Sequence, residues 1–411
     1  MMKGDVYVFD RIGFSDPLTG VEIIRITDNK AFYDRPYFTT TQFTRDGRYT
    51  IFVSDFTKTS VVKNPNAPAI GKVGFGELFL LELETGKALQ LTQGEAIKMG
   101  HGAHAMLAPD GKTAYYYSNE ELKETDIETL ISKAWMHIPD TYNFHSLSIT
   151  DDCRYVAFSL VEEVPLVTAI FADQLAEAAP GARERFFKQP GSLVLRYDRM
   201  KECCEAIYGG HERITHVGMD PGDGSHMLFC NDGPWHLVQR MWTVDVLTDE
   251  VKPLFRQQKY LEQVGHEFFT PSGRVGAQYS FRYKADMPFF QHADIFMDFD
   301  GKNQERFYYP YDRPGHVSVA VNEHQGVGDS CMLSGNWKDS RRYLSLINYN
   351  SQEHKAEPGL LCAHDTSGKK SAHVHPVFTP DGSHILFSSD KEGLLNIYMV
   401  EADWSKARRT L

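Results

Sequence analysis

The sequence predicts an all-β protein, and three features of its 411 residues lead to that prediction. A turn rich in Asp and Gly recurs along the whole chain, and each copy lies between two segments that read as strands. The copies follow one another at intervals of about 50 residues, which fits one four-stranded propeller blade. Aromatic residues make up 12% of the chain and favour strands. We therefore expect a seven-bladed β-propeller that forms a single domain over residues 1–411.

Each copy of the turn has the pattern of a β-hairpin. An apolar segment leads into the turn, and apolar and polar residues alternate after it. Most copies are followed by a second hairpin signal, so that two hairpins give one four-stranded sheet, and the last copy is expected to pair with strands from both ends of the chain. An array of β-sandwiches is the alternative architecture. The seven copies start at Phe43, Leu107, Ile149, Met219, Phe269, Val321 and Phe378, and the copy at Val321 is degenerate.

One segment, at about residues 161–190, departs from the strand pattern. It contains A-I-F-A-D-Q-L-A-E-A-A, which predicts a short helical insertion, and Pro180 with Gly181 would end the helix. Two roles are open for this insertion, a lid over one face of the propeller or an addition to its surface.

Composition excludes several classes of protein. The net charge of −12 argues against a nucleic-acid-binding protein, which needs a basic face. We expect no membrane span, because no run of 18 apolar residues occurs, and no export signal, because the start has no apolar segment. None of the six cysteines forms a C-x-x-C pair, which favours reduced thiols and a cytoplasmic location. The oligomeric state stays open.

Histidine recurs at one position of the repeat. Five histidines lie six residues before the same turn position, and His216 fits with a slip of one residue. In a propeller this position opens the innermost strand of each blade, so these imidazoles are expected to converge at one mouth of the channel. Convergent imidazoles indicate a metal site, a general base or both. The five histidines are His104, His145, His266, His316 and His375.

A metal site is predicted at His316, His373 and His375. His373 and His375 flank Val374, and residues i and i+2 of a strand point to the same side. Together with His316 they offer three nitrogen ligands and an open position for a divalent cation. The alternative is that the H-V-H pair has a purely structural role.

Other side chains are candidates for catalysis and substrate binding. His266 is either a general base or a histidine satisfied by Glu267 or a backbone carbonyl. Arg240 can bind a carboxylate while Trp235 stacks on a sugar ring, or it forms a structural ion pair. The remaining substrate-binding candidates are Tyr37, which precedes the first turn, and His145 and His216 from the repeated position.

Three segments of the chain resemble the oligogalacturonate lyases of polysaccharide lyase family 22. They are C-N-D-G-P-W-H-L-V-Q-R-M-W at residues 230–242, H-E-F-F-T-P at 266–271 and H-V-H-P-V-F-T-P-D at 373–381. F-T-R-D-G near the start and V-G-D after the sixth turn match in the same order, so that the resemblance covers nearly the full length.

The resemblance implies a cytoplasmic seven-bladed propeller that cleaves short oligogalacturonates by β-elimination to 4,5-unsaturated products. It implies Mn²⁺ or another divalent cation held by His316, His373, His375 and a glutamine, with His266 as the base and Arg240 beside it. The glutamine position falls on Lys370, and a protonated lysine does not ligate a metal. Either three histidines and water hold the cation, or Lys370 supplies part of its charge and contacts the substrate.

Other functions stay open at this point. A lyase or hydrolase acting on another uronate-containing oligosaccharide fits the same residues, as does a carbohydrate-binding propeller without catalysis. A peptidase propeller is disfavoured, because the chain contains no G-x-S-x-G motif and no length for a hydrolase domain. In each favoured case the expected partner is a small acidic oligosaccharide.

Overall fold

A computed structural model describes residues 2–62, 74–164, 188–233, 238–259, 261–282, 290–330, 342–367 and 372–409. All the elements whose bounds lie within these residues are strands, which confirms the all-β prediction. The chain divides into two compact units, Met1–His137 with Phe307–Leu411, and Ile138–Arg306. No helix long and apolar enough to cross a membrane occurs among the described residues. The single-domain expectation stays a prediction.

The first half of the first unit is one ten-stranded sheet made of two antiparallel meanders. Strand β8 joins the meanders by pairing with both β6 and β10. The first meander runs in the order β4-β5-β6-β7-β1, and the second in the order β9-β10-β11-β12. The strands are β1 (Val6–Val8), β4 (Tyr33–Asp34), β5 (Tyr49–Ser54), β6 (Phe75–Glu82), β7 (Lys87–Gln90), β8 (Ile97–Lys98), β9 (Ala105–Leu107), β10 (Thr113–Ser118), β11 (Glu121–Asp126) and β12 (Ser132–His137).

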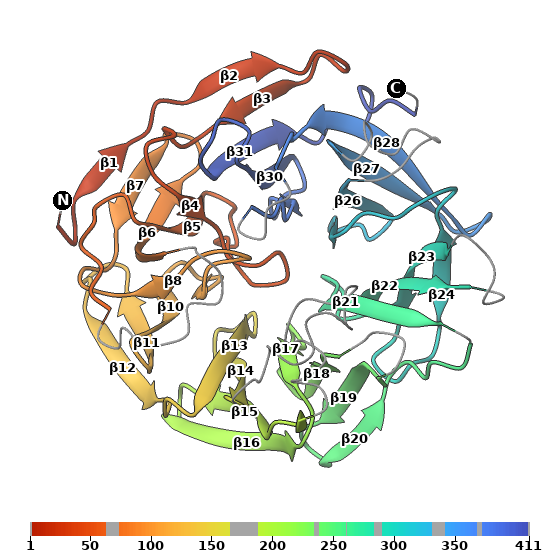
Figure 1. Ribbon diagram of the computed structural model, residues 1–411, viewed down its shortest axis with the longest axis horizontal. Helices are drawn as coiled ribbons and strands as arrows, with labels where there is room; N and C mark the ends of the chain where they lie inside the picture. Colours follow the sequence, from red (N-terminus) through yellow and green to blue (C-terminus); the bar gives the residue numbers. More distant parts are fainter. Residues whose placement is uncertain are drawn as a thin grey trace, which may run out of the picture. The chain divides into compact units, whose positions relative to one another are not determined.

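The rest of the first unit contains a meander and a sheet shared by both ends of the chain. Figure 1 shows the N-terminal strands β2 and β3 alongside the C-terminal β31, and Ile23 pairs with Val400 there. This confirms that the last repeat pairs with strands from both termini. The shared sheet contains β2 (Ile12–Ser15), β3 (Glu22–Arg25), β31 (Asn396–Glu401), β30 (His384–Ser389) and β29 (Val377–Phe378). The meander is β25 (Val317–Val319), β26 (Gln325–Asp329), β27 (Tyr343–Asn350) and β28 (Lys355–Ala363).

The second unit contains three further antiparallel meanders, each in chain order. The predicted insertion falls mainly on residues 165–187, outside the described residues, between β14 and β15. The strands are β13 (Tyr142–Ile149), β14 (Tyr155–Glu162), β15 (Ser192–Asp198), β16 (Cys203–Gly210), β17 (Ile214–Met219), β18 (His226–Asn231), β19 (Met241–Asp245), β20 (Glu250–Pro253), β21 (Gln263–Phe269), β22 (Val275–Phe281), β23 (Gln291–Met297) and β24 (Glu305–Tyr308).

The repeated turns are held by the residues that predicted them. In the first and last copies a threonine hydroxyl donates to the turn aspartate at 2.6 Å, from Thr44 to Asp46 and from Thr379 to Asp381. The same Asp oxygen accepts a backbone N–H two residues later, which is the local bond that favours Asp in turns. Gly47 adopts φ 70°, a left-handed conformation that glycine takes without steric cost. The hairpin prediction is confirmed at each of the repeated turns.

Apolar side chains on the strand faces form the cores. Phe52 and Phe79 pair across β5 and β6 and stack with ring centroids 5.1 Å apart. In the second unit Ala157, Val217 and Phe229 belong to one buried cluster of β14, β17 and β18. These cores fix the strands, and the histidines described below lie just before strands or at bulges within them.

Candidate functional site

The structure brings the predicted metal-binding histidines of the first unit together. His316 immediately precedes β25, and His373 and His375 precede β29. The ring centroids are 4.6 Å apart for His316 and His375, 5.6 Å for His316 and His373, and 5.1 Å for His373 and His375. The tertiary structure therefore joins two segments about 60 residues apart in sequence, as expected for ends of innermost strands.

His316 is oriented by Asp329 at the end of β26. Its Nδ1 lies 2.7 Å from Asp329 Oδ2, and its backbone N–H donates to Oδ1 at 2.7 Å. Burial works to raise the pKa of Asp329, but the charge and hydrogen bonds of His316 outweigh burial and bring that pKa to about 2. A histidine bonded through Nδ1 to a carboxylate presents Nε2, which is the usual arrangement of a metal-ligating histidine.

His375 has a buried ring nitrogen, Nε2, that is available to bind a ligand. Its side chain is only 4% exposed, and Nε2 has no hydrogen-bond partner within the described part of the chain. Burial first, then the charges of the neighbouring imidazoles and Arg35, holds its pKa well below the usual range, so that the ring is neutral. A buried polar atom without a partner is costly unless something else binds it. A divalent cation, which takes neutral imidazole nitrogen, fits this position.

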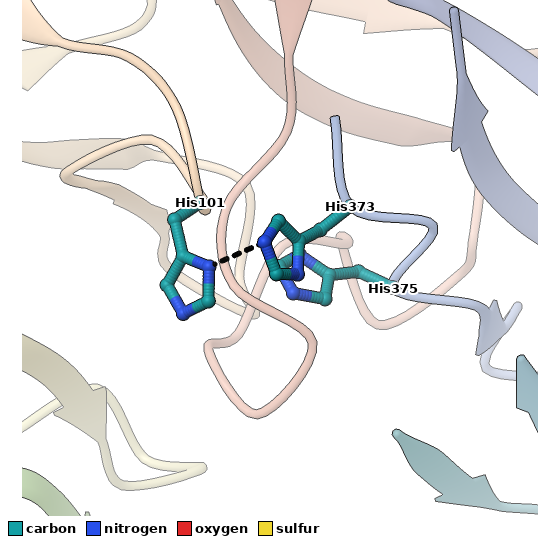
Figure 2. Close-up of side chains that lie close together, drawn as sticks. All are labelled: His101, His373 and His375. Carbon is teal, nitrogen blue, oxygen red and sulfur yellow. Dashed lines mark hydrogen bonds between the residues drawn. The ribbon is translucent and has the colours of Figure 1, made fainter. Parts of the chain in front are cut away.

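A further histidine, which the sequence prediction missed, joins this cluster. His101 lies in the segment between β8 and β9, and its Nδ1 is 2.9 Å from Nε2 of His373 (Figure 2). The ligand atoms of His101, His373 and His375 all lie within 4.8 Å of one another. The repeat pattern selected His104 instead, because only that residue keeps the spacing to the turn. The signal available in the sequence was the G-H-G triplet at residues 100–102.

Two aromatic residues pack against the cluster. The ring of Tyr37, predicted to bind substrate, lies 4.7 Å from that of His375 and 6.1 Å from that of His316. The Phe38 ring lies 5.1 Å from His316. Apolar ring faces beside a cation site exclude water and strengthen electrostatic interactions there. Tyr37 thus contacts the metal-binding candidates.

The second unit carries three of the repeated histidines, and each sits at an irregularity of its strand. The strand registers shift between His145 and Ser148 in β13, between Ile214 and Val217 in β17, and between Gly265 and Phe268 in β21. His145, His216 and His266 therefore lie at β-bulges. A bulge redirects a side chain away from the regular alternation, and bulges are frequent beside active sites.

His266 is held by a neutral partner. Its Nδ1 lies 2.6 Å from Oε1 of Gln278 on the neighbouring strand β22. When Nδ1–H donates to this amide oxygen, Nε2 carries the lone pair and can accept a proton. The structural alternative to a general base at His266 was a histidine satisfied by Glu267 or a backbone carbonyl, and the structure shows the Gln278 amide as a partner of its ring.

Arg240 and Glu267 form a buried ion pair beside His216. Arg240 Nε donates to Glu267 Oε2 at 3.1 Å, and both side chains are 1% exposed. Burial opposes the charge on Glu267, but Arg240 and then His216 outweigh it and lower the pKa of Glu267. Asp232 accepts a second hydrogen bond from Arg240, at 3.3 Å. The ion pair that the sequence left open for Arg240 is therefore present.

His216, Cys230 and Glu267 also group closely enough to hold a cation. Burial works to lower the pKa of His216, but Cys230 and Glu267 outweigh it and raise that pKa to about 10. An imidazolium and the guanidinium of Arg240 on the same carboxylate oppose a further cation there.

Three predicted residues stay without structural support. Trp235 and Lys370 lie outside the described residues. His145 is half-buried, and its backbone carbonyl accepts a hydrogen bond from Ser159 at 3.4 Å. A separate cleft of the first unit is lined by Arg45, Asp46 and Asp110 at the turns and contains none of the predicted site residues.

The chain is similar over its whole length to known proteins. A protein named oligogalacturonate lyase from Dickeya dadantii (strain 3937) is 26% identical over 423 residues, which cover 98% of each chain. A protein named oligogalacturonide lyase from Pectobacterium atrosepticum is 24% identical, again over 98% of each chain.

Two solved structures share the fold. The oligogalacturonate lyase of Vibrio parahaemolyticus has a TM-score of 0.79 at 23% identity, covering 98% of this chain and 100% of that one. A structure described as oligogalacturonate lyase in complex with manganese has a TM-score of 0.79 at 22% identity, with 99% and 100% covered. The family profile described as oligogalacturonate lyase matches residues 1–405, so the chain belongs to the oligogalacturonate lyase family.

Proposed function

We propose that this protein cleaves short oligogalacturonates by β-elimination and releases 4,5-unsaturated products. Membership of the oligogalacturonate lyase family supports this reaction. The observation within the molecule that carries it is the cluster of His316, His373 and His375, with the buried Nε2 of His375 directed to no protein partner among the described residues.

The chemistry assigns a role to each side chain. The C5 proton of a uronate is weakly acidic, because its carbon is next to the carboxyl group. His266 accepts this proton at Nε2, with Gln278 holding the ring. Arg240, fixed by Glu267 and Asp232, orients the carboxylate. The electron pair of the former C5–H bond then forms the C4–C5 double bond, the bond from C4 to the leaving oxygen breaks, and that oxygen takes up a proton from solvent.

His316, His373 and His375 would hold a divalent cation. A cation at this position supplies positive charge for the carboxyl group, on which negative charge develops as the proton leaves. Manganese fits the proposal because a family structure is described in complex with it. Tyr37 beside the cluster, together with His145, His216, Trp235 and Lys370, is proposed to bind the sugar chain.

Fold, location and partner complete the proposal. The meanders of the two units are proposed to be blades of a seven-bladed propeller, in line with the propeller-like fold of the similar structures. The partner is a small acidic oligosaccharide and the location is the cytoplasm. The five cysteines that the structure describes form no disulfide, which agrees with a reducing compartment.

A continuous absorbance assay tests the reaction. Incubation with oligogalacturonates should raise absorbance in the band of the conjugated uronate, and a chelator should abolish the rise. Mass spectrometry of the products separates elimination, which adds no water, from hydrolysis, which does. Binding of the oligomer with no product of either kind would identify a binding protein instead. Turnover that persists in chelator would remove the metal from the mechanism while leaving the lyase.

A further inference from the structure

The segment that carries His101 is fixed by the residues that follow β4. The backbone N–H of Gly100 donates to Asp34 Oδ2 at 2.6 Å, and that of Ala103 donates to the Arg35 carbonyl at 2.9 Å. Gly102 adopts φ 101°, and a Cβ there would lie 2.8 Å from the backbone nitrogen of Tyr37. Gly100, Gly102 and Ala103, which surround His101, are thus held against one neighbouring segment, so the position of His101 does not depend on its own exposed side chain.

Arg35, the residue after Asp34, fixes the H-V-H segment at residues 373–375. The Arg35 side chain is 1% exposed, and its Nη2 donates to the backbone carbonyls of His375 at 2.8 Å and Val374 at 3.4 Å. Nη1 donates to Gln42 at 2.9 Å, which holds the guanidinium in place. Asp34 and Arg35 are neighbours in sequence. Together they therefore fix the segment that carries His101 relative to the segment that carries His373 and His375.

The nitrogen–nitrogen distance between the two segments, which forms a hydrogen bond here, also fits a shared metal ligand sphere. Two nitrogens that each bind one cation at roughly 2.1 Å lie about 3.0 Å apart at a right angle and about 3.4 Å apart at the tetrahedral angle. His101 Nδ1 and His373 Nε2 are 2.9 Å apart. The rings of His101 and His375 are 5.7 Å apart between centroids, and Figure 2 shows the three rings gathered at the meeting point of two segments.

We propose that His101 is a ligand of the metal and that, among the described residues, the cation is held by nitrogen donors alone, from His101, His316, His373 and His375. This inference rests on the proposed function for the existence of the metal site and goes beyond it in the donor set. Imidazole suits Zn²⁺ and Ni²⁺, whereas oxygen donors suit Mn²⁺. A site without an oxygen donor from the protein favours Ni²⁺ over Mn²⁺ more strongly than a site that contains one.

Calorimetric titration of the metal-free full-length chain with Ni²⁺ and with Mn²⁺ tests this proposal. His101→Ala should weaken Ni²⁺ binding by at least about 10-fold, the lower end of the loss caused by removing even an indirect partner of a ligand. His101→Gln offers an amide oxygen in place of the imidazole. This variant should lose more affinity for Ni²⁺ than for Mn²⁺, so that the difference between the two affinities becomes smaller. His324→Ala, which removes an exposed histidine of the same unit, should leave both affinities unchanged.

The absorption spectrum of the Ni²⁺-loaded protein gives a second readout, because replacing an imidazole alters the ligand field. A His101→Ala protein with the wild-type spectrum and wild-type Ni²⁺ affinity would overturn the proposal, as would a wild-type chain that binds neither ion. Failure of the proposed function has a different signature: metal binding that depends on His101 in a protein that converts no uronate oligomer.

Discussion

At the scale of single residues, two histidines show how a partner at Nδ1 selects the chemistry at Nε2. His316 is bonded to the carboxylate of Asp329, whereas His266 is bonded to the amide of Gln278. A carboxylate partner increases the basicity of the ring and suits a metal ligand. An amide partner fixes the ring without adding negative charge, which suits a base that must be neutral before it accepts a proton. The two histidines are therefore held in ways that suit the different roles we propose for them.

We expect His266→Ala to lower kcat by about 10²- to 10⁴-fold, the range typical of a positioned general base. Gln278→Glu should keep activity but move the acid limb of the kcat/KM profile to higher pH, because a carboxylate stabilises the imidazolium form. Steady-state rates across pH, compared with Gln278→Leu as a variant that removes the hydrogen bond without adding charge, measure the effect. An unchanged profile in Gln278→Glu would show that His266 is not the titrating base.

At the scale of elements, short irregular segments position the candidate site and the strands carry them. His316, His373 and His375 precede short strands, and the repeated histidines of the second unit lie at β-bulges. Regular pairing would send alternate side chains to opposite faces, and a bulge breaks that alternation. The segment at residues 100–102 is likewise irregular and is positioned by a strand, because Asp34 of β4 and Tyr37 after it contact its backbone.

Gly102→Ala tests the fit of this segment. Its added Cβ would lie 2.8 Å from the Tyr37 backbone and occupy a left-handed conformation, so we expect lower thermal stability and weaker Ni²⁺ binding. Gly382→Ala is the matched control, because Gly382 also has a positive φ but no atom within 4 Å of a new Cβ. The control carries only the left-handed strain, about 1–2 kcal/mol. Equal losses of stability in the two variants would contradict a tight contact at Gly102.

At the scale of the whole molecule, charge buried in the second unit connects stability to pH. His216 has a raised pKa of about 10, so its contribution is complete below the unfolded value of about 6.5 and fades as pH rises toward 10. The pKa of Glu267 is lowered, so its contribution is present above the unfolded value and is lost only at strongly acidic pH. Both contributions are complete between about pH 4.5 and 6.5.

We therefore expect the urea concentration at the unfolding midpoint to decrease as the pH is raised from about 6.5 to about 10. This decrease should be smaller in His216→Gln. Chemical unfolding at several pH values, with His324→Gln as an exposed control, measures the difference. A fall of the same size in His216→Gln would show that His216 does not carry its charge in the folded chain.

Strand pairing links the two ends of the chain within the first unit. Ile23 of β3 is 1% exposed and pairs with Val400 of β31, near Tyr398 in the same buried cluster. The N-terminal strands thus supply the outer part of a sheet whose inner strands come from the C-terminus. This arrangement leaves neither terminal hairpin to stand alone, and an isolated hairpin is marginally stable in water.

The sequence by itself determined the strands, the hairpin turns and three of the clustered histidines. These features are local, since turn chemistry depends on neighbours such as Thr44 and Asp46, His316 and His375 share one position in a repeat, and His373 lies two residues before His375. Only the tertiary structure decided that His101 joins His373, that Gln278 holds His266 and that Arg240 pairs with Glu267. The contacts of His101 and Arg240 join segments distant along the chain, and that of His266 depends on which side chain of the neighbouring strand faces it, so none of the three has a periodic signature in the sequence.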